Sequence, residues 1–237
     1  MILAAGKGTR LQRRTEKTPK ALVRAGGMSL LERLIGKLKA EGFTYIVINV
    51  HHLAGQITAF LEEHDNFGLD IRISEEREQL LETGGGIMHA APLLQGDEPF
   101  LVHNVDILSD LNLRALYHAH LKNNTLATLA VRNRETSRYL LFDEKLRMRG
   151  WENKKTGEKI IPREYDAPLN PFAFSGIHVI SPGIFKLFAE SGSFSIIDTY
   201  LRLCPEHKIA GYLHDEGYWI DAGKPEGLAE ADKLLSL

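Results

Sequence analysis

The first residues that could do chemistry lie in a glycine-rich segment at the start of the chain, LAAGKGTRL at residues 3–11. Its glycines leave backbone amides able to wrap a polyphosphate, and Arg10 and Lys20 can neutralise the charge. Pro19 fixes its own backbone and biases Thr18 toward an extended form, so Lys20 leaves the loop in a defined direction. The pattern favours a phosphate-binding loop over the alternative, a tight turn with exposed cations.

Two familiar phosphate-binding motifs do not match this segment. A P-loop requires Ser or Thr directly after its Gly-Lys pair, and here Gly8 follows. A dinucleotide-binding fingerprint requires a third glycine, where Leu11 stands, and an acidic residue after the second strand, where the sequence reads HHLAGQ. These departures argue against a P-loop enzyme and against a nicotinamide-dependent dehydrogenase.

The elements that must position this loop follow from the alternation of short apolar runs with segments of helical period. Strands rich in β-branched residues are expected at residues 1–5, 45–50, 69–73 and 100–105. The helix that follows Ser29 has a capping box, because Glu32 lies three residues on, and Gly42 is its stop signal. Alternation of this kind implies parallel strands joined by right-handed crossovers. We therefore predict an α/β fold with a doubly wound, mostly parallel sheet flanked by helices.

The second half of the chain changes character. Residues 133–172 are polar and rich in turn residues, which is typical of a small β-rich lid or insertion laid over the end of the sheet. A last helix is expected from about Lys224 to the chain end, although Lys224 could instead contact phosphate. No repeat or linker interrupts the sequence, so we expect one domain over residues 1–237.

Ligands of such a sheet bind outside the carboxyl ends of its strands. The segments expected at those ends are AAGKGTR, LLETGGG, HNVD, FSGI and YWIDAGK. All of them carry glycine or a charged residue, which a purely structural sheet has little reason to place there.

Composition limits the partners. The chain has 43 % hydrophobic and 25 % charged residues, as an ordinary globular protein does, and its net charge of −2 gives no broad attraction to nucleic acid or membrane surfaces. No apolar run approaches the roughly 20 residues that span a bilayer, and residues 1–5 are too short for a signal peptide. The single cysteine, Cys204, cannot form an intramolecular disulfide. We therefore expect a cytoplasmic protein that meets phosphate with local cations and amides.

Taken in order, LAAGKGTRL, TPKALV, LETGGGI, a strand ending at Asp106, FSGI and WIDAGKPEGL resemble the signature series of the sugar-1-phosphate nucleotidyltransferases. The resemblance runs from residue 1 to about residue 235. It implies a Rossmann-like nucleotidyltransferase fold and transfer of a nucleoside monophosphate from a nucleoside triphosphate (NTP) to a sugar 1-phosphate, with release of pyrophosphate. LETGGGI followed by APLL is most similar to the N-acetylmuramic acid 1-phosphate uridylyltransferases of cell-envelope metabolism, then to the mannose- and heptose-1-phosphate guanylyltransferases.

The resemblance implies a nucleotide-binding half at residues 1–132 and a sugar-phosphate-binding half with the lid at residues 133–237. The implied nucleotide-binding residues are Leu3, Ala4, Ala5, Gly6, Gly8, Thr9, Arg10, Lys20, Glu82, Thr83, Gly84 and Gly85. Within this set, Arg10 would hold the β- and γ-phosphates and Lys20 would lie near the α-phosphate. Residues 82–85 would receive the base, with glycines that let a flat ring approach the backbone; the alternative there is a glycine-rich helix start.

The resemblance also makes Asp106 and Asp221 the metal ligands. Attack of a sugar phosphate on the α-phosphate brings anion against anion, and a divalent cation that bridges both relieves the repulsion. Mg²⁺ takes one or two carboxylates together with phosphate oxygens and water. The implied catalytic set is therefore Arg10, Lys20, Asp106 and Asp221 with Mg²⁺ as cofactor, and both aspartates must end strands on the same side of the sheet.

The sugar phosphate has its own candidate residues. They are Asn104, Glu164, Asn170, Ser175 and Gly176, which offer amide, carboxylate and hydroxyl groups and one site of close backbone contact. The expected partners are an NTP and a sugar 1-phosphate, bound by a monomer or a small homo-oligomer. The best match is UTP with N-acetylmuramic acid 1-phosphate. The alternatives are GTP with mannose or heptose 1-phosphate, and a non-catalytic nucleotide-sugar-binding module, against which the presence of both aspartates argues.

Overall fold

The computed structural model describes residues 1–235, apart from the side chains of residues 12–14, so the ends of the predicted domain and last helix at residues 236–237 lie outside it. The strands are β1 (Ile2–Leu3), β2 (Arg24–Ala25), β3 (Met28–Ser29), β4 (Tyr45–Val50), β5 (Asp70–Glu75), β6 (Phe100–Asn104), β7 (Ile107–Ser109), β8 (Ala127–Arg132), β9 (Arg138–Phe142), β10 (Met148–Asn153), β11 (Glu158–Ile160), β12 (Asn170–Ile180), β13 (Ile209–Leu213) and β14 (Trp219–Asp221). The α-helices are α1 (Leu30–Ala40), α2 (Ala54–Glu63), α3 (Glu82–His89), α4 (Leu113–Asn123), α5 (Ile196–Leu203) and α6 (Pro225–Leu235). The 3-10 helices are η1 (Thr9–Arg14), η2 (Lys20–Leu22), η3 (Asp65–Gly68), η4 (Ala91–Leu93) and η5 (Pro182–Lys186). Within residues 1–235, no helix is long and apolar enough to cross a membrane.

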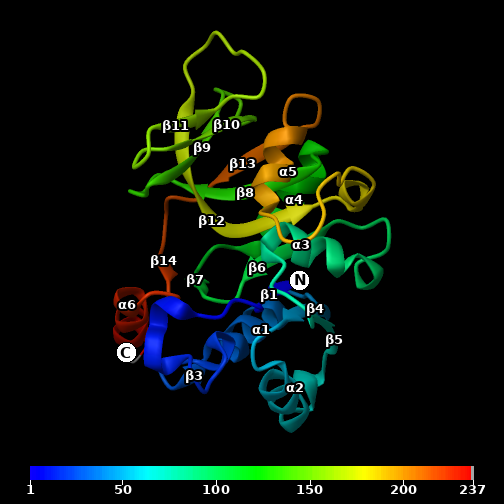
Figure 1. The fold of residues 1–237 in the computed structure, drawn as a ribbon, viewed down its shortest axis with the longest axis vertical. Helices are drawn as coiled ribbons and strands as arrows, with labels where there is room; N and C mark the ends of the chain where they lie inside the picture. Colours follow the sequence, from blue (N-terminus) through cyan, green and yellow to red (C-terminus); the bar gives the residue numbers. More distant parts are fainter. Residues whose placement is uncertain (236–237) are drawn as a thin grey trace.

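One large sheet runs the length of the molecule, from β9–β11 at one end to β4 and β5 at the other (Figure 1). Its order is β11-β10-β9-β12-β6-β1-β4-β5, with β8 paired to β12 and β13 paired to β8. The run β6-β1-β4-β5 is parallel, and Ile2 of β1 lies in register with Ile48 of β4 and His103 of β6. The long strand β12 runs antiparallel to β6, β8 and β9. This mixed, mostly parallel sheet flanked by helices confirms the predicted α/β fold.

Helices cover both faces of the sheet because its strands are apolar on both faces. Ile46 and Ile48 of β4 pack in one cluster with buried residues of α1, α2 and α4, whereas Val47 packs in a second cluster with residues of α3 and α5. In β6, Leu101 packs in the first cluster and Val102 packs in the second. Successive side chains of a strand point to opposite faces, so a continuous apolar run requires cover on both.

Helix α1 shows how local signals set an element that supports the site. Ser29 caps it by accepting a hydrogen bond from the Glu32 amide at 3.1 Å, an interaction worth about 1 kcal/mol. The Lys37 ammonium donates to the carbonyls of Ser109 and Leu111, each at 2.7 Å. The helix therefore holds the chain segment that follows β7.

The predicted lid continues the sheet instead of lying over it. Strand β9 pairs antiparallel with the first residues of β12, and β10 and β11 extend the sheet outward from β9. Figure 1 places these strands at the end of the molecule opposite α1 and α2. The first half of β12 therefore belongs to the lid, and its second half pairs with β6 beside the predicted metal ligand.

A short ribbon outside the large sheet positions the second aspartate. Strand β14 pairs antiparallel with β7, so Asp221 lies opposite Ile107, and the Ala222 amide donates to the Asp106 carbonyl at 2.9 Å. The two aspartates were expected to end strands on the same side of the sheet, and the structure brings them together through this ribbon instead of through two strands of the large sheet. Asp106 precedes β7 and Asp221 ends β14, and the antiparallel pairing brings them together.

Candidate active site

Asp106 and Asp221 lie beside the two cations that the sequence singled out. The Lys20 ammonium pairs with Asp106 Oδ2. One guanidinium nitrogen of Arg10 lies 3.3 Å from Asp221 Oδ2 and the other lies 3.9 Å from Asp106 Oδ2. The aspartate side chains are 11 % and 17 % exposed. Residues from four separate segments of the chain thus form one partly buried charge cluster.

The backbone after Asp221 closes one side of this cluster. The Gly223 amide donates to Asp221 Oδ1 at 3.1 Å. A side chain at Gly223 would displace the Asp106 carboxylate and the Lys20 ammonium, so glycine here leaves room for this ion pair. Lys224 directly precedes α6, as its helix-start reading predicted, and its ammonium also lies 3.4 Å from Asp221 Oδ2.

The donor set of the cluster fits Mg²⁺. Its metal-binding groups are two carboxylates, and Mg²⁺ commonly takes one or two carboxylates while substrate phosphates and water complete its coordination. Among residues 1–235 no group of three or more histidine, cysteine or acidic side chains could hold a metal ion, as a closed zinc site requires. A metal held by Asp106 and Asp221 would compete with Lys20 and Arg10, which would then be free to face phosphate oxygens.

The loop after β1 is held from inside the protein by a buried chain of hydrogen bonds. Asn49 Oδ1 accepts from the amides of Ala4 (2.9 Å) and Ala5 (3.3 Å). The Asn49 amide group donates to the Glu76 carboxylate, which also accepts from the Leu81 amide at 2.8 Å. Asn49 and Glu76 are 1 % and 2 % exposed. The glycine loop and the segment before α3 are therefore tied to each other through the sheet.

Sequence analysis missed Asn49 and Glu76. Burial raises the pKa of Glu76, and the hydrogen bonds from Leu81 and Asn49 oppose that shift. A signal was present, because Asn49 is a polar residue within the apolar strand YIVINV and lies near its carboxyl end. Such a residue needs a buried partner, but the sequence does not say which one.

The glycine loop itself folds back on Lys20. Gly8 has φ +66°, and its missing side chain leaves room for Thr15 and Lys20, whose Cβ would lie 3.1 Å from a Cβ at Gly8. The Thr15 hydroxyl donates to the Gly8 carbonyl at 2.9 Å, and Thr9 then begins η1. The Arg10 side chain is 53 % exposed. Lys20 is thus fixed by the loop, whereas Arg10 reaches out from it.

The predicted base-binding residues start α3, as the alternative reading proposed. Thr83 Oγ1 accepts a hydrogen bond at 3.0 Å from the segment 192–196, and the Gly84 amide donates at 2.9 Å to a carbonyl of the same segment. The space beside Gly84 and Gly85 is filled by that segment. These glycines therefore allow α3 to pack closely on residues 192–196, a reason that the sequence did not suggest. Glu82 is exposed and has φ +58°.

Of the sugar candidates, Asn104 and Gly176 lie together and Ser175 does not face them. A Cβ at Gly176, where φ is +74°, would lie 2.8 Å from the Asn104 amide nitrogen. The Ser175 side chain is fully buried and hydrogen-bonds His214 Nε2 at 2.8 Å; burial lowers the pKa of His214 to about 4. The Ser175 carbonyl accepts from the Trp219 indole at 2.9 Å. The Ser175 hydroxyl is thus bonded to His214 within the protein and its carbonyl holds Trp219, so contact of this hydroxyl with the sugar stays a prediction.

The structure also places Glu164 and Asn170 away from the aspartates. Glu164 lines a separate small cavity of about 80 Å³ together with Arg149 and Cys204. Asn170 begins β12 at its lid end, about 20 Å of strand from Gly176 at the usual rise per residue. Neither residue joins the group of side chains around the two carboxylates.

Arg134 is a residue near the cluster that sequence analysis missed. Its guanidinium lies 4.0 Å from the centre of the Trp219 ring and donates to the Phe174 carbonyl at 3.0 Å. Burial lowers the pKa of Arg134, and the charge of Asp221 acts in the opposite direction. The available signal was its place near the start of the polar, turn-rich segment expected at residues 133–172.

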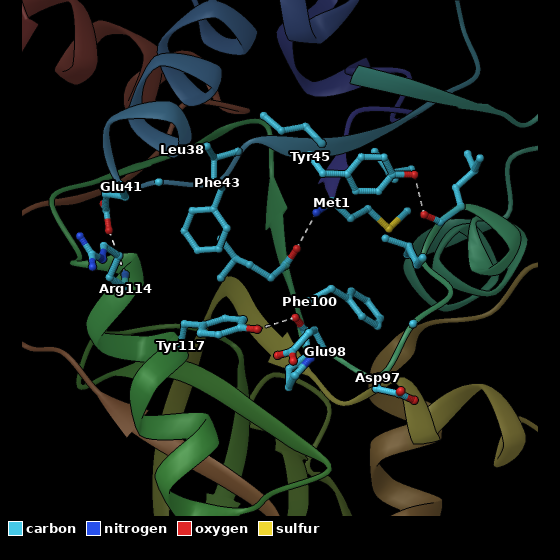
Figure 2. A pocket seen from close by; sticks show the side chains of 18 of the residues that line it. Met1, Leu38, Glu41, Phe43, Tyr45, Asp97, Glu98, Phe100, Arg114 and Tyr117 are labelled. Atoms are coloured by element: carbon cyan, nitrogen blue, oxygen red, sulfur yellow. Dashed lines mark hydrogen bonds between the residues drawn. The ribbon is translucent and has the colours of Figure 1, made fainter. Parts of the chain in front are cut away.

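A cavity of about 560 Å³ lies at the other end of the strands (Figure 2). Tyr45 and Phe100, the first residues of β4 and β6, line it together with Met1, whose amine donates to the Leu101 carbonyl at 2.6 Å. The length of β6 separates this cavity from Asp106. The candidate active site is therefore at the carboxyl ends of the strands, where α/β sheets bind ligands.

Comparisons with known proteins cover almost the whole chain. The family model described as nucleotidyl transferase matches residues 1–236. The N-acetylmuramate alpha-1-phosphate uridylyltransferase of Neisseria meningitidis serogroup B is 34 % identical over 239 residues, with 99 % of this chain and 96 % of that protein covered. The protein of the same name from Caulobacter vibrioides is 32 % identical over 245 residues, with 100 % and 96 % covered. The structure of HddC from Yersinia pseudotuberculosis complexed with GMP-PN matches with a TM-score of 0.77 at 21 % identity, covering 98 % of this chain and 97 % of that one.

Proposed function

The chain belongs to the sugar-1-phosphate nucleotidyltransferase family, whose members transfer a nucleotidyl group from an NTP to a sugar 1-phosphate, and on that premise we propose that it joins UTP and N-acetylmuramic acid 1-phosphate. The observation that carries the reaction is the meeting of Asp106 and Asp221 with Arg10 and Lys20. The two full-length relatives named for this uridylyl transfer support the choice of base and sugar.

The triphosphate binds first, across the loop of residues 3–10, in the half of the chain before residue 133. The sugar phosphate then enters from the half that includes β12 and β14. One of its phosphate oxygens forms a bond to the α-phosphorus, and the bond from that phosphorus to the oxygen bridging the β-phosphate breaks. The electron pair leaves with pyrophosphate. The attacking oxygen is already ionised, so the reaction needs neither a general base nor a covalent enzyme intermediate.

The cations of the cluster stabilise the charge that moves in this step. Arg10 is exposed and presents two guanidinium nitrogens toward the aspartates, a geometry that suits bidentate contact with the departing pyrophosphate. Lys20 is fixed against the glycine loop and serves the α-phosphate. Mg²⁺ held by Asp106 and Asp221 would neutralise the two phosphates that must approach each other.

The proposal is tested by pyrophosphate release with Mg²⁺, running UTP, GTP, CTP, ATP and dTTP against N-acetylmuramic acid, mannose, glucose and heptose 1-phosphates. UTP with N-acetylmuramic acid 1-phosphate is expected to exceed every other pair in kcat/KM by about tenfold or more, the discrimination of one good polar contact. A preference for GTP with mannose or heptose 1-phosphate would replace the substrates and keep the reaction. Nucleotide binding without turnover of any pair would point to a non-catalytic nucleotide-sugar-binding module.

A further inference from the structure

Among the residues that the structure describes, Arg134 carries a positive charge with no carboxylate at ion-pair distance. It follows β8, and its guanidinium is half-buried between the Trp219 ring and the Phe174 carbonyl. Its Nε is buried, and no residue in the described part of the chain forms a hydrogen bond with it. In the part of the chain that the structure describes, no carboxylate oxygen lies within 4.0 Å of Arg134.

An arginine in this position can bind an anion that comes from outside the chain. Taking a cation partly out of water is unfavourable unless it is paired, and burial lowers the pKa of Arg134 accordingly. Stacking on Trp219 fixes the plane of the guanidinium, whose two Nη atoms donate to the carbonyls of Phe174 (3.0 Å) and Glu135 (3.5 Å), and its other N–H bonds remain for a planar partner. A carboxylate has the matching geometry.

The cavity next to Arg134 has the size and lining of a sugar site. It measures about 440 Å³, within the range of small-molecule sites, and Tyr139, Trp151 and Phe174 line it with Arg134. Threonine and serine side chains in the same lining offer hydroxyl groups. Trp219 lies two residues before Asp221 on the same face of β14, so Arg134 contacts both this cavity and the strand that carries Asp221.

We propose that Arg134 binds a carboxylate carried by the sugar ring, so that this enzyme selects an acidic sugar 1-phosphate over its neutral counterpart. The inference rests on the proposed function, which brings a sugar phosphate to Asp221. The anomeric phosphate enters at the cluster of Asp106 and Asp221, where the Lys224 ammonium lies 3.4 Å from Asp221 Oδ2. Arg134 instead faces the cavity that holds the rest of the sugar.

Two substrates isolate this contact. N-acetylmuramic acid 1-phosphate differs from N-acetylglucosamine 1-phosphate by one lactyl ether that ends in a carboxylate. The measurement is the ratio of their kcat/KM values with UTP, in the wild type and in Arg134→Gln, Arg134→Lys and the control Arg72→Gln, an exposed arginine of β5 paired with Asp70. Thermal unfolding of each variant accompanies the kinetics.

The wild-type ratio is expected to favour the acidic sugar, and Arg134→Gln is expected to lower the ratio by about 10- to 100-fold, the effect of losing a charged hydrogen-bonded pair. Arg134→Lys is expected to fall in between, because a point charge lacks the planar fork. Arg72→Gln is expected to leave the ratio unchanged. If Arg134→Gln does not fold, the wild type is compared on the lactyl acid and its uncharged carboxamide, with the same expected preference.

Three results overturn the inference. A wild-type ratio near one excludes selection by the carboxylate, and so does equal turnover of the acid and its carboxamide. An equal fall for both sugars in Arg134→Gln, with the ratio unchanged, assigns Arg134 to the phosphate or to folding. In these cases pyrophosphate release by the wild type leaves the proposed reaction standing. Absence of release with both sugars removes the proposed function and the inference together.

Discussion

Replacement of Asn49 by alanine tests whether the buried hydrogen-bond chain positions the nucleotide loop. The substitution removes the side-chain acceptor of the Ala4 and Ala5 amides and the donor to Glu76. Ala4 keeps a second bond, from its amide to the Asn49 backbone carbonyl at 3.2 Å, and Glu76 keeps the Leu81 amide. The perturbation is therefore confined to the Ala5 amide and one oxygen of the carboxylate.

The magnitude follows from these two losses. A buried amide left without an acceptor costs about 1–3 kcal/mol, and a lost hydrogen bond to a charged group costs about 1.5–3 kcal/mol. Asn49→Ala is therefore expected to lower the free energy of unfolding by about 3–5 kcal/mol, a large share of the ~5–15 kcal/mol that holds a typical domain. Release of the loop is expected to lower kcat/KM for the triphosphate by about 10- to 100-fold, the effect of misplacing a positioning group by about 1 Å.

Urea unfolding and steady-state pyrophosphate release measure the two effects. The matched control is Asn112→Ala, which removes the N-cap of α4, where Asn112 Oδ1 accepts from the Ala115 amide at 2.8 Å. The control is expected to lose about 1 kcal/mol of stability and to keep its kinetics for the triphosphate. Asn49→Asp keeps the two loop bonds, so it is expected to lose stability while retaining most of its triphosphate kinetics.

Two results would refute this reasoning. A decrease of less than about 1 kcal/mol in the free energy of unfolding of Asn49→Ala would mean that water replaces the missing side chain. The hydrogen bonds of Asn49 would then not be shielded from solvent. If the free energy of unfolding falls by the whole predicted amount while the triphosphate kinetics of the folded enzyme stay unchanged, the loop is positioned by other contacts, such as those between Gly8 and Lys20.

Three further predictions follow from the same structure. Asp106→Asn and Asp221→Asn are each expected to lower kcat for pyrophosphate release at saturating Mg²⁺ by about 100-fold or more, because loss of a metal ligand removes several kcal/mol of charge stabilisation. The control Asp70→Asn, at an exposed aspartate, should stay near wild type, whereas near-normal turnover in the Asp106 or Asp221 variant would remove the metal assignment. Glu76 has a raised pKa, so the folded state holds its proton more tightly and the free energy of unfolding should fall as pH rises above about 4.5. Urea titrations from pH 4 to 8 should show this fall in the wild type and not in Glu76→Gln, and the same pH dependence in both proteins would contradict it. Burial raises the pKa of the Cys204 thiol to about 11, so alkylation by iodoacetamide at pH 7.5 should be slow in the folded protein and fast in urea, and equal rates would refute the burial.

The elements that carry local signals could be predicted from the sequence. The strand expected at residues 45–50 is β4 (Tyr45–Val50), because four of its six residues are apolar and β-branched and can be buried on both faces of a sheet. The helix after Ser29 begins and ends where its cap and Gly42 indicated. In both cases the signal lies within a dozen residues, and tertiary packing agrees with it.

The contacts that complete the site could not be predicted, because they join residues far apart in the chain. The sequence indicated that Asp106 and Asp221 must meet, but nothing in WIDAGK shows that its strand pairs antiparallel with β7 outside the large sheet. Ser175 has the residue type of a sugar ligand, yet its direction in β12 turns it toward His214. Arg134 lies in a polar segment where any one arginine is ordinary, and its stacking on Trp219 is what makes it a candidate.

The carboxylates of Asp106 and Asp221 have a structural role that precedes any metal. Without them, the Lys20 ammonium, whose side chain is 12 % exposed, would be held in a largely buried place with no anion beside it, and the exposed Arg10 would lose the carboxylates that it contacts. The aspartates therefore keep the cations assembled before substrate arrives, and phosphate oxygens take them over when it binds. Measured together, stability and turnover separate the two roles. An asparagine variant that loses turnover at unchanged stability assigns the carboxylate to the reaction, whereas a parallel loss of both assigns it to holding the cations in place.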